Sequence, residues 1–320
     1  MKVAYKYFKL IATKEMKNMK SDQQIMNELA AKTNYLREIT LEESTAQKEL
    51  LLEMYQDIAR VCDAHNLVYM LGGGTCLGAI RHKGYIPWDD DLDLMMPRDS
   101  YEKFIKVCYA GELGEKYEID TPRKNHDCKN PFLKVFRKNS LDIELQNENT
   151  PFPKGIYIDI FPMDSAPTSK ITQRIKGFLS DTLRRICTSV LYAEYPSQKY
   201  KEFMSLDPAA LKRYKARLFV GKIFGIISHA QWVWWFDQFN SSTKDTGFTT
   251  IPTGRKGYFG ECRTSDIYYP VSKATFEGIE VNVPNKVHEY LTSMYRNYMD
   301  LPPIEKRERH QVYQFKLPER

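Results

Sequence analysis

The chain has 320 residues, of which 42% are hydrophobic and 28% are charged, with 16 Gly and 16 Pro. These values exclude a disordered, collagen-like or low-complexity chain, and the length allows about two domains or one large domain with an insertion. The six cysteines form no CxxC pair and no dense pattern, which excludes a zinc ribbon and a disulfide scaffold.

The net charge of +6 comes from 47 Lys and Arg against 41 Asp and Glu, and it is concentrated in two stretches. Residues 1–20 hold six Lys and one Glu, and residues 170–222 hold twelve Lys or Arg and four acids. In both, bases alternate with apolar and aromatic residues, as in helices that lie on an anionic membrane surface. The alternative is an ordinary solvated helix face. Nucleic acid is not expected as a partner, because no nucleic-acid-binding module accompanies the bases.

Outside the glycine-rich stretch near residue 75, the longest run without a charged residue is the fourteen residues 223–236. A membrane-spanning helix needs ~20 apolar residues, so none is predicted. The first residues carry scattered lysines and no small-residue cleavage site, which argues against a secretory signal. We therefore expect a cytoplasmic protein, with peripheral attachment to the inner face of the cell membrane through the basic stretches.

Helical spacing of apolar residues predicts a helix from Leu41 to Leu67, with Thr40 and Glu43 as its capping box. A short strand at 68–71, a glycine turn at 72–75 and a short helix ending near residue 84 follow. Polar and apolar residues alternate over 91–94, which predicts a strand with one solvent-facing side. Asp99 is expected to cap the next helix, at 101–109.

Further strands are predicted at 132–137, 141–145 and 156–161, and a last helix at 286–299. Between them, 168–240 is basic and mostly helical, and 241–269 is expected to form loops and short strands. The predicted organisation is a basic amphipathic N-terminal extension (1–40), a catalytic core (41–167), a helical insertion (168–240) and a C-terminal part that completes the domain (241–320).

Three carboxylates are expected to form a metal site. Residues two apart in a strand point the same way, so Asp91 and Asp93 share one face. Asp159 lies opposite the apolar face of Ile156, Ile158 and Ile160 and brings a third carboxylate from a neighbouring strand. Such close acids repel one another unless a cation lies between them, and oxygen ligands suit Mg²⁺, with Mn²⁺ as the alternative ion.

The glycine run allows close approach of a phosphate to the start of the following helix. It is not a dinucleotide fingerprint, because Leu77 stands where that pattern requires glycine. It is not a Walker loop, because Ala79 and Ile80 replace Lys and Ser or Thr. A phosphate site beside a metal site is therefore predicted without either nucleotide motif.

The longest motif resembles the signature of the LicD family: LGGGTCLGAIRHKGYIPWDDDLDL at 71–94. The resemblance continues in YIDIFPMD (157–164), FEGIEVNVP (276–284), YLTSMY (290–295), and LPP (301–303) with Lys306, Arg307 and His310. It implies an α+β fold, with a nucleotidyltransferase-like mixed sheet core flanked by helices and carrying a basic helical insertion.

The implied activity is transfer of phosphocholine, or of a polyol phosphate such as ribitol or glycerol phosphate, from a CDP-activated donor to a sugar hydroxyl. The fukutin-related ribitol-phosphate transferases share the motif. The implied acceptor is a cell-surface glycan or its lipid-linked precursor, of the teichoic acid, capsular or lipopolysaccharide type. The alternative enzyme is a nucleotidyltransferase that moves NMP from an NTP to a small molecule or RNA. A non-catalytic scaffold is disfavoured, because all three candidate acids are present.

The resemblance also implies roles for single residues. Asp91 and Asp93 match the paired metal ligands, Asp159 the third acid, and Asp89 a further catalytic acid. Gly73, Gly74 and Thr75 match the phosphate turn. The base for the acceptor hydroxyl is left open between Asp159 and Asp89. Either donor-phosphate contacts or plain surface charge explains four further residues: Arg81, His82, Lys83 and Lys134. Trp88 either packs the acidic loop or stacks on a base or choline.

Overall fold

The computed structural model describes residues 28–30, 32–122, 128, 130–303, 307 and 311–319. Most of the predicted N-terminal extension, and Lys306 and His310, lie outside the described residues. Within these ranges, no helix combines the length and the apolar character that a membrane span requires.

A seven-stranded mixed sheet forms the centre of the molecule. Its main path runs through β1 (Met70–Leu71), β2 (Asp93–Pro97), β6 (Tyr157–Ser165), β4 (Leu133–Arg137) and β3 (Tyr117–Asp120), with β7 (Phe248–Thr250) beside β6 and β8 (Arg263–Thr264) beside β7. The pair β2–β6 is parallel and the other pairs are antiparallel. The predicted α+β fold with a mixed sheet is thereby confirmed.

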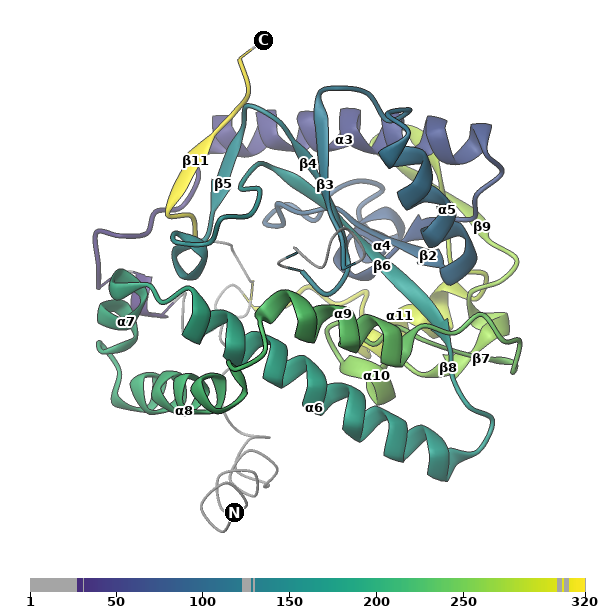
Figure 1. Cartoon of the computed structure of the whole chain (residues 1–320). Helices are drawn as coiled ribbons and strands as arrows, with labels where there is room; N and C mark the ends of the chain where they lie inside the picture. Colours follow the sequence, from purple (N-terminus) through teal and green to yellow (C-terminus); the bar gives the residue numbers. More distant parts are fainter. Residues whose placement is uncertain are drawn as a thin grey trace.

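Helices cover the sheet. The helix α3 (Leu41–Ala64) packs on β6, α4 (Gly73–Arg81) packs on β2, and α5 (Arg98–Tyr109) packs on β2 and β6. Figure 1 shows α3 along the upper side and the insertion helices along the lower side. These are α6 (Lys170–Glu194), α7 (Gln198–Met204), α8 (Pro208–Phe224) and α9 (His229–Asn240). The helix α6 contacts both α8 and α9, so the basic region 168–240 is a helical layer of its own.

The sequence of α3 accounts for its position. Its capping box forms as predicted, with the Glu43 backbone N–H donating to Thr40 and the Thr40 backbone N–H donating to Glu43. Leu51, Met54 and Ile58 recur at helical spacing and are fully buried. One apolar stripe therefore fixes α3 onto the main core.

The C-terminal part folds back onto the glycine-rich helix. Its elements are α10 (Gly257–Gly260), the hairpin β9 (Ser272–Phe276) and β10 (Ile279–Val283), and α11 (Val287–Tyr295). The last strand, β11 (Gln314–Lys316), pairs with β5 (Leu141–Ile143), and two short 3₁₀ turns are η2 (Leu145–Asn147) and η3 (Ser265–Ile267). The strand β9 and helix α11 contact α4, so residues far apart in sequence meet at the glycine run.

Several predicted boundaries differ from the structure; the first helix, for example, ends at Ala64 and not at Leu67. The strand predicted at 91–94 is β2, which begins at Asp93 and continues through three consecutive buried residues, because both faces of this inner strand are covered. Asp99 does not cap α5, because that helix begins at Arg98 and has no side-chain cap. The strand β6 extends to Ser165, and α11 ends at Tyr295, where Arg296 takes a positive φ of 61°.

Candidate active site

The glycine run is the first turn of α4 itself. Gly72 is the N-cap, and Gly73 has a φ of +46°, a left-handed conformation that favours glycine. A Cβ atom on Gly73 would lie 2.9 Å from Asp93 Oδ2, and one on Gly74 would lie 2.8 Å from Asp89 Oδ2. Glycine is therefore needed here because two carboxylates approach the start of the helix.

Two hydrogen bonds fix this helix start. The Gly73 backbone N–H donates to the Tyr290 hydroxyl at 3.0 Å. The Asp93 backbone N–H donates to Thr75 Oγ1 at 2.8 Å, and Thr75 is buried. Thr75 thus joins α4 to β2, and it positions Asp93 instead of facing a ligand.

Three neighbouring strands bring charged side chains together. Asp93 and Asp159 are direct partners in the parallel pair β2–β6, so their side chains share one face. Lys134 is the partner of Asp159 on β4, and its Nζ lies 2.6 Å from Asp159 Oδ1. Ile158 and Ile160 are fully buried on the other face, as the alternation predicts.

The acids raise the energy of one another's charged forms. Burial raises the pKa of the Asp93 carboxyl well above its usual value, and the negative charges of Asp91, Asp159 and Asp89 raise it further. The positive charge of Lys134 acts in the opposite direction. Added positive charge at this point would stabilise the ionised acids.

A cavity of about 530 Å³, which we call the glycine cavity, opens beside the start of α4. This volume is typical of small-molecule sites. The core contributes glycines, charged residues and one tryptophan to its wall: Gly72, Gly73, Gly74, Arg81, Asp89, Asp91, Asp93 and Trp88. The C-terminal part contributes bases and aromatic residues: Arg255, Lys256, Tyr290, Tyr295 and Tyr298. The cavity therefore combines metal-type ligands with positively charged groups.

The side chains of Arg81 and Trp88 are held by the protein. Arg81 Nη1 donates to the Tyr298 backbone carbonyl at 2.7 Å. The Trp88 ring has Arg307 Cζ 4.2 Å from its centroid and the His82 ring edge-on at 6.3 Å. Trp88 thus packs against protein groups and also lines the glycine cavity.

A second cavity, of about 410 Å³, lies between the sheet and α6, and we call it the insertion cavity. Asp91 lines both cavities, whereas Asp159 and Lys134 line only the insertion cavity. The cluster of Asp91, Asp93 and Asp159 therefore lies where the glycine cavity and the insertion cavity adjoin.

Three other residues that were predicted to contact the donor lie outside both cavities. Thr75, His82 and Lys83 line neither cavity, and Lys83 is exposed. We therefore do not place His82 and Lys83 in a donor site.

Three residues of the glycine cavity were missed by sequence reasoning. Arg255 and Lys256 follow Gly254 in a loop, and only the adjacent pair of bases marks them in the sequence. Tyr295 is partly buried beside the acids: desolvation raises the pKa of its hydroxyl, and the charge of Asp93 raises it further. All three come from a part of the chain that only tertiary contacts bring to α4.

A divalent metal fits the acids by ligand chemistry and by charge. Asp91 and Asp93 supply carboxylate oxygens beside further acids that raise the pKa of Asp93. Mg²⁺ is commonly held by one or two carboxylates together with substrate phosphates. Among the described residues, no group of three His, Cys, Asp or Glu side chains is arranged to hold an ion. The fit therefore rests on a carboxylate pair that a bound diphosphate would complete.

The mixed sheet and its flanking helices are consistent with a nucleotidyltransferase-like fold, in which the glycine start of α4 lies beside the acids on β2 and β6. Residues 66–180 match the family described as LicD/FKTN/FKRP, nucleotidyltransferase domain. The lipopolysaccharide cholinephosphotransferase LicD of Haemophilus influenzae is 28% identical over 279 residues, which cover 87% of this chain and 98% of that protein. An uncharacterised protein of Rickettsia prowazekii is 33% identical over 118 residues, which cover 37% of this chain and 40% of that protein. Residues 66–180 of the chain are thus similar to the nucleotidyltransferase domain of the LicD family, and the similarity to the Haemophilus protein extends over most of the chain.

Proposed function

We propose that this protein transfers phosphocholine from a CDP-activated donor to a hydroxyl of a glycan or its lipid-linked precursor, with release of CMP. The observation that carries the proposal is the pairing of Asp93 with Asp159 across β2 and β6, beside the glycine start of α4. The similarity to the Haemophilus protein, which is named a lipopolysaccharide cholinephosphotransferase, supports the choice of alcohol and acceptor class.

The donor diphosphate occupies the glycine cavity in this proposal. The start of a helix attracts phosphate, and glycines leave its backbone accessible. Arg81, Arg255 and Lys256 line the same cavity and add positive charge. Asp91 and Asp93 would hold Mg²⁺ or Mn²⁺, which supplies positive charge to the diphosphate when bound.

The reaction is a displacement at phosphorus. The acceptor hydroxyl oxygen forms a bond to the phosphorus that carries choline, and the bond from that phosphorus to the oxygen of CMP breaks. The hydroxyl proton passes to a nearby carboxylate, Asp159 or Asp89. Phosphoryl transfer depends mainly on positioning and on charge stabilisation, which the helix start, the bases and the carboxylate pair provide.

Release of CMP tests this proposal. The purified protein is incubated with Mg²⁺ and CDP-choline, CDP-glycerol or CDP-ribitol, each with a panel of lipid-linked glycans. We expect CMP and glycan-bound phosphocholine from CDP-choline alone, and no product in EDTA. Asp91→Asn should lower the rate at least about a hundredfold, because it weakens a contribution of several kcal/mol.

Asp99→Asn is the matched control, because Asp99 is exposed on α5 and lines neither cavity. It should keep the rate of the unmodified protein. Release of CMP from CDP-glycerol or CDP-ribitol instead of CDP-choline would support the same type of reaction but with a different alcohol phosphate. Pyrophosphate release from an NTP, with no CMP from any donor, would replace the proposal with the nucleotidyltransferase alternative.

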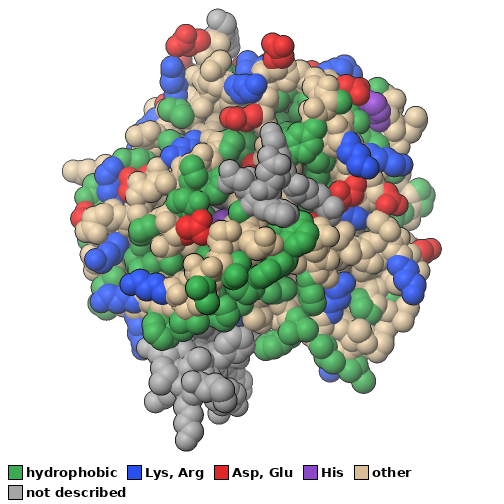
Figure 2. All heavy atoms as spheres, in the orientation of Figure 1, with side chains coloured by type: hydrophobic (Ala, Val, Ile, Leu, Met, Phe, Trp, Pro, Cys, Tyr) green, Lys and Arg blue, Asp and Glu red, His purple; other side chains and the backbone are tan. Residues whose placement is uncertain are grey.

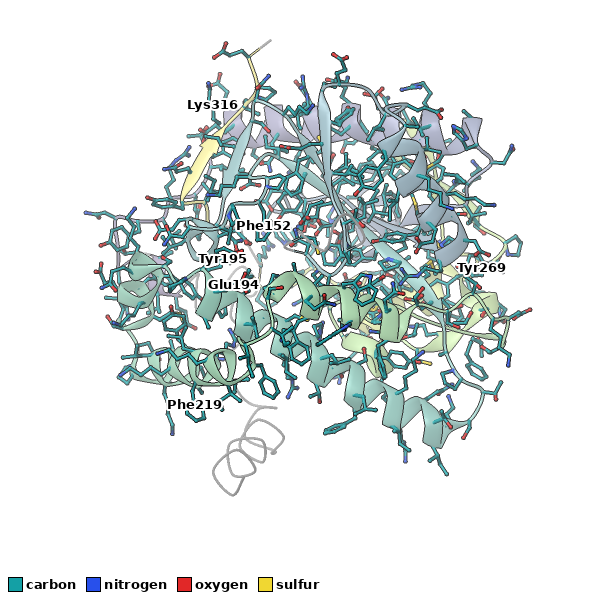
Figure 3. All side chains as sticks on the ribbon, viewed as in Figure 1. Phe152, Glu194, Tyr195, Phe219, Tyr269 and Lys316 are labelled. Carbon is teal, nitrogen blue, oxygen red and sulfur yellow. The ribbon has the colours of Figure 1, made fainter. Side chains whose placement is uncertain are left out.

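Attachment to an anionic membrane surface is the second part of the proposal. Exposed apolar side chains lie on the outer side of the insertion: Ile171, Ile175, Phe178 and Leu179 on α6, and Phe219 and Ile223 on α8. Figure 2 shows hydrophobic side chains along this lower edge, and Figure 3 labels Phe219 there. Exposed bases accompany them on both helices: Lys170, Arg174, Lys215 and Lys222. Apolar side chains flanked by bases fit a surface of anionic lipid.

Flotation with vesicles tests the attachment. We expect the protein to float with vesicles that contain phosphatidylglycerol and to remain below with pure phosphatidylcholine. The double variant Ile175→Glu, Phe178→Glu should lose flotation. Leu41→Glu is the control, because Leu41 is 85% exposed but lies on α3, away from the insertion. Equal flotation of the double variant and this control would contradict the attachment.

A further inference from the structure

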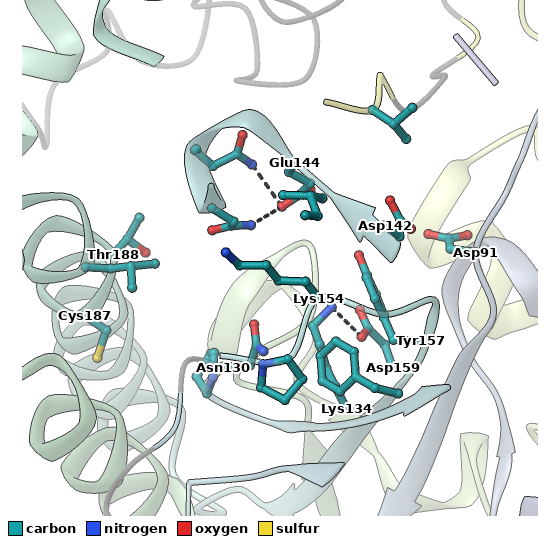
Figure 4. A pocket seen from close by; sticks show the side chains of 18 of the residues that line it. Asp91, Asn130, Lys134, Asp142, Glu144, Lys154, Tyr157, Asp159, Cys187 and Thr188 are labelled. Carbon is teal, nitrogen blue, oxygen red and sulfur yellow. Dashed lines mark hydrogen bonds and ion pairs between the residues drawn. The ribbon is translucent and has the colours of Figure 1, made fainter. Parts of the chain in front are cut away.

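The insertion cavity has the position expected of a second substrate site. Its walls come from β4, β5 and β6 on one side and from α6 on the other. Figure 4 shows Thr188 and Cys187 of α6 facing Asp91 and Asp159 across the space. The cavity is thus built jointly by the sheet that carries the acids and by the helical insertion.

The insertion cavity reaches the carboxylates without any residue of the glycine run in its wall. Asp91 lines both cavities, so a ligand in each would meet at this residue. Asp159 lines only the insertion cavity, where its ion pair with Lys134 fixes the carboxylate. Asp89 lines only the glycine cavity. A hydroxyl that enters from the insertion cavity therefore meets Asp159 and not Asp89.

The lining of the insertion cavity is rich in groups that pair with hydroxyls. Glu144 Oε2 accepts hydrogen bonds from the side-chain amides of Gln146 at 3.0 Å and Asn147 at 2.6 Å. The amide oxygens of Gln47 and Gln146 are buried and have no hydrogen-bond partner among the described residues. Gln47 is 4% exposed. Buried polar atoms are nearly always paired, so these two acceptors call for a donor from a ligand.

Aromatic rings complete the lining. Phe136, Tyr157 and Tyr192 offer apolar surface among the polar groups. A saccharide carries hydroxyls that donate and accept, together with apolar C–H faces, and so matches both parts of this wall. The volume of the insertion cavity, about 410 Å³, also falls in the range of small-molecule sites.

We infer that the insertion cavity binds the saccharide acceptor and places its reacting hydroxyl beside Asp159. This inference rests on the proposed function, because it assumes that the donor occupies the glycine cavity. It gives the insertion a role in the choice of acceptor, since α6 forms one wall.

A pair of matched threonines tests the site. Thr188 and Thr182 both lie on α6, and both donate their hydroxyl to the carbonyl four residues earlier, at 3.2 Å and 2.7 Å. Only Thr188 lines the insertion cavity. Thr188→Trp should fill the cavity and weaken saccharide binding at least about tenfold, whereas Thr182→Trp should leave it unchanged.

Binding is measured on an array of bacterial saccharides in the presence of CDP and Mg²⁺, and CDP-choline affinity is measured separately by calorimetry. Loss of array binding in Thr188→Trp, with donor affinity kept, is the expected result. Equal array binding by both tryptophan variants would overturn the inference, and so would an array on which the unmodified protein binds nothing. Failure of the unmodified protein to bind CDP-choline would instead contradict the proposed function.

A second pair of variants, Gln146→Leu and Gln198→Leu, tests the same site if Thr188→Trp does not fold. Gln146→Leu removes an amide that donates to Glu144 at 3.0 Å inside the cavity. Gln198→Leu removes an amide that donates to Glu202 at 3.0 Å on the exposed side of α7. Weakened saccharide binding in Gln146→Leu alone supports the acceptor site, and equal binding in both variants contradicts it.

Discussion

A buried cluster of three charged side chains joins the insertion to the sheet. Its geometry predicts how much stability the variant Arg98→Met loses. Arg98 lies at the junction of β2 and α5 and donates two hydrogen bonds to Asp164 of β6, at 2.7 Å and 2.6 Å. It donates a third to Asp237 of α9 at 2.8 Å. The exposed fractions of the three side chains are 2%, 0% and 1%. Arg98→Met therefore removes a buried positive charge that contacts two buried carboxylates.

Removing one partner of a buried ion pair costs about 3–5 kcal/mol. The unfolding entropy is about 2.1 cal/mol/K per residue, which is ~0.7 kcal/mol/K for the 320 residues. The melting temperature of Arg98→Met should therefore fall by about 5–7 °C in scanning calorimetry at pH 7.

Arg60→Met is the matched control for this variant. Arg60 is 62% exposed and lies 3.7 Å from Asp57, so its ion pair is on the surface. Loss of such a pair costs less than about 1 kcal/mol, or under ~2 °C. Equal shifts for Arg98→Met and Arg60→Met would refute the reasoning, because the buried cluster would then contribute no more than a surface pair.

Two further predictions concern the helix starts. Gly73→Ala places a Cβ atom 2.9 Å from Asp93 Oδ2 and should lower kcat for CMP release about a hundredfold. Gly111→Ala is the control, because Gly111 also has a positive φ but an added Cβ would meet no atom within 4 Å; its kcat should not change. A hydrogen bond from Arg37 lowers the pKa of Glu43 to about 2 from 4.5, so its stabilising contribution is complete above pH 4.5 and is lost as the pH falls toward 2. Urea unfolding of Glu43→Gln, which keeps the capping box, should differ from the unmodified protein more at pH 7 than at pH 3; the same difference at both would contradict this.

Local patterns in the sequence were sufficient where one element alone decides the structure. Helical periodicity and a capping box predicted α3, and strict alternation over 156–160 placed Asp159 on the solvent-facing side of β6. The alternation at 91–94 was less reliable, because Asp91 precedes the strand and Leu94 begins a fully buried run. Period-two patterns fail in inner strands, where both faces are covered.

The rest of the site depends on contacts between distant residues. The Arg98 cluster spans 66 and 139 positions of sequence, and Gly73 bonds to Tyr290 across 217 positions. Thr75 reads in the sequence as part of a phosphate turn, yet its hydroxyl accepts from the Asp93 backbone. A residue's type was visible in the sequence, but its partner was set by the packing of α4 against β2 and the C-terminal part.

The helical insertion carries both of the proposed binding surfaces, the membrane-facing apolar side chains and one wall of the insertion cavity. One part of α6 lines the insertion cavity with Thr188, while its exposed residues Ile175 and Phe178 face outward beside bases. The buried pair of Arg98 and Asp237 ties α9 to the sheet, and α9 packs on α6. A saccharide carried on a membrane lipid would therefore meet the apolar face and the insertion cavity on the same layer of helices, and Asp159 lines that cavity.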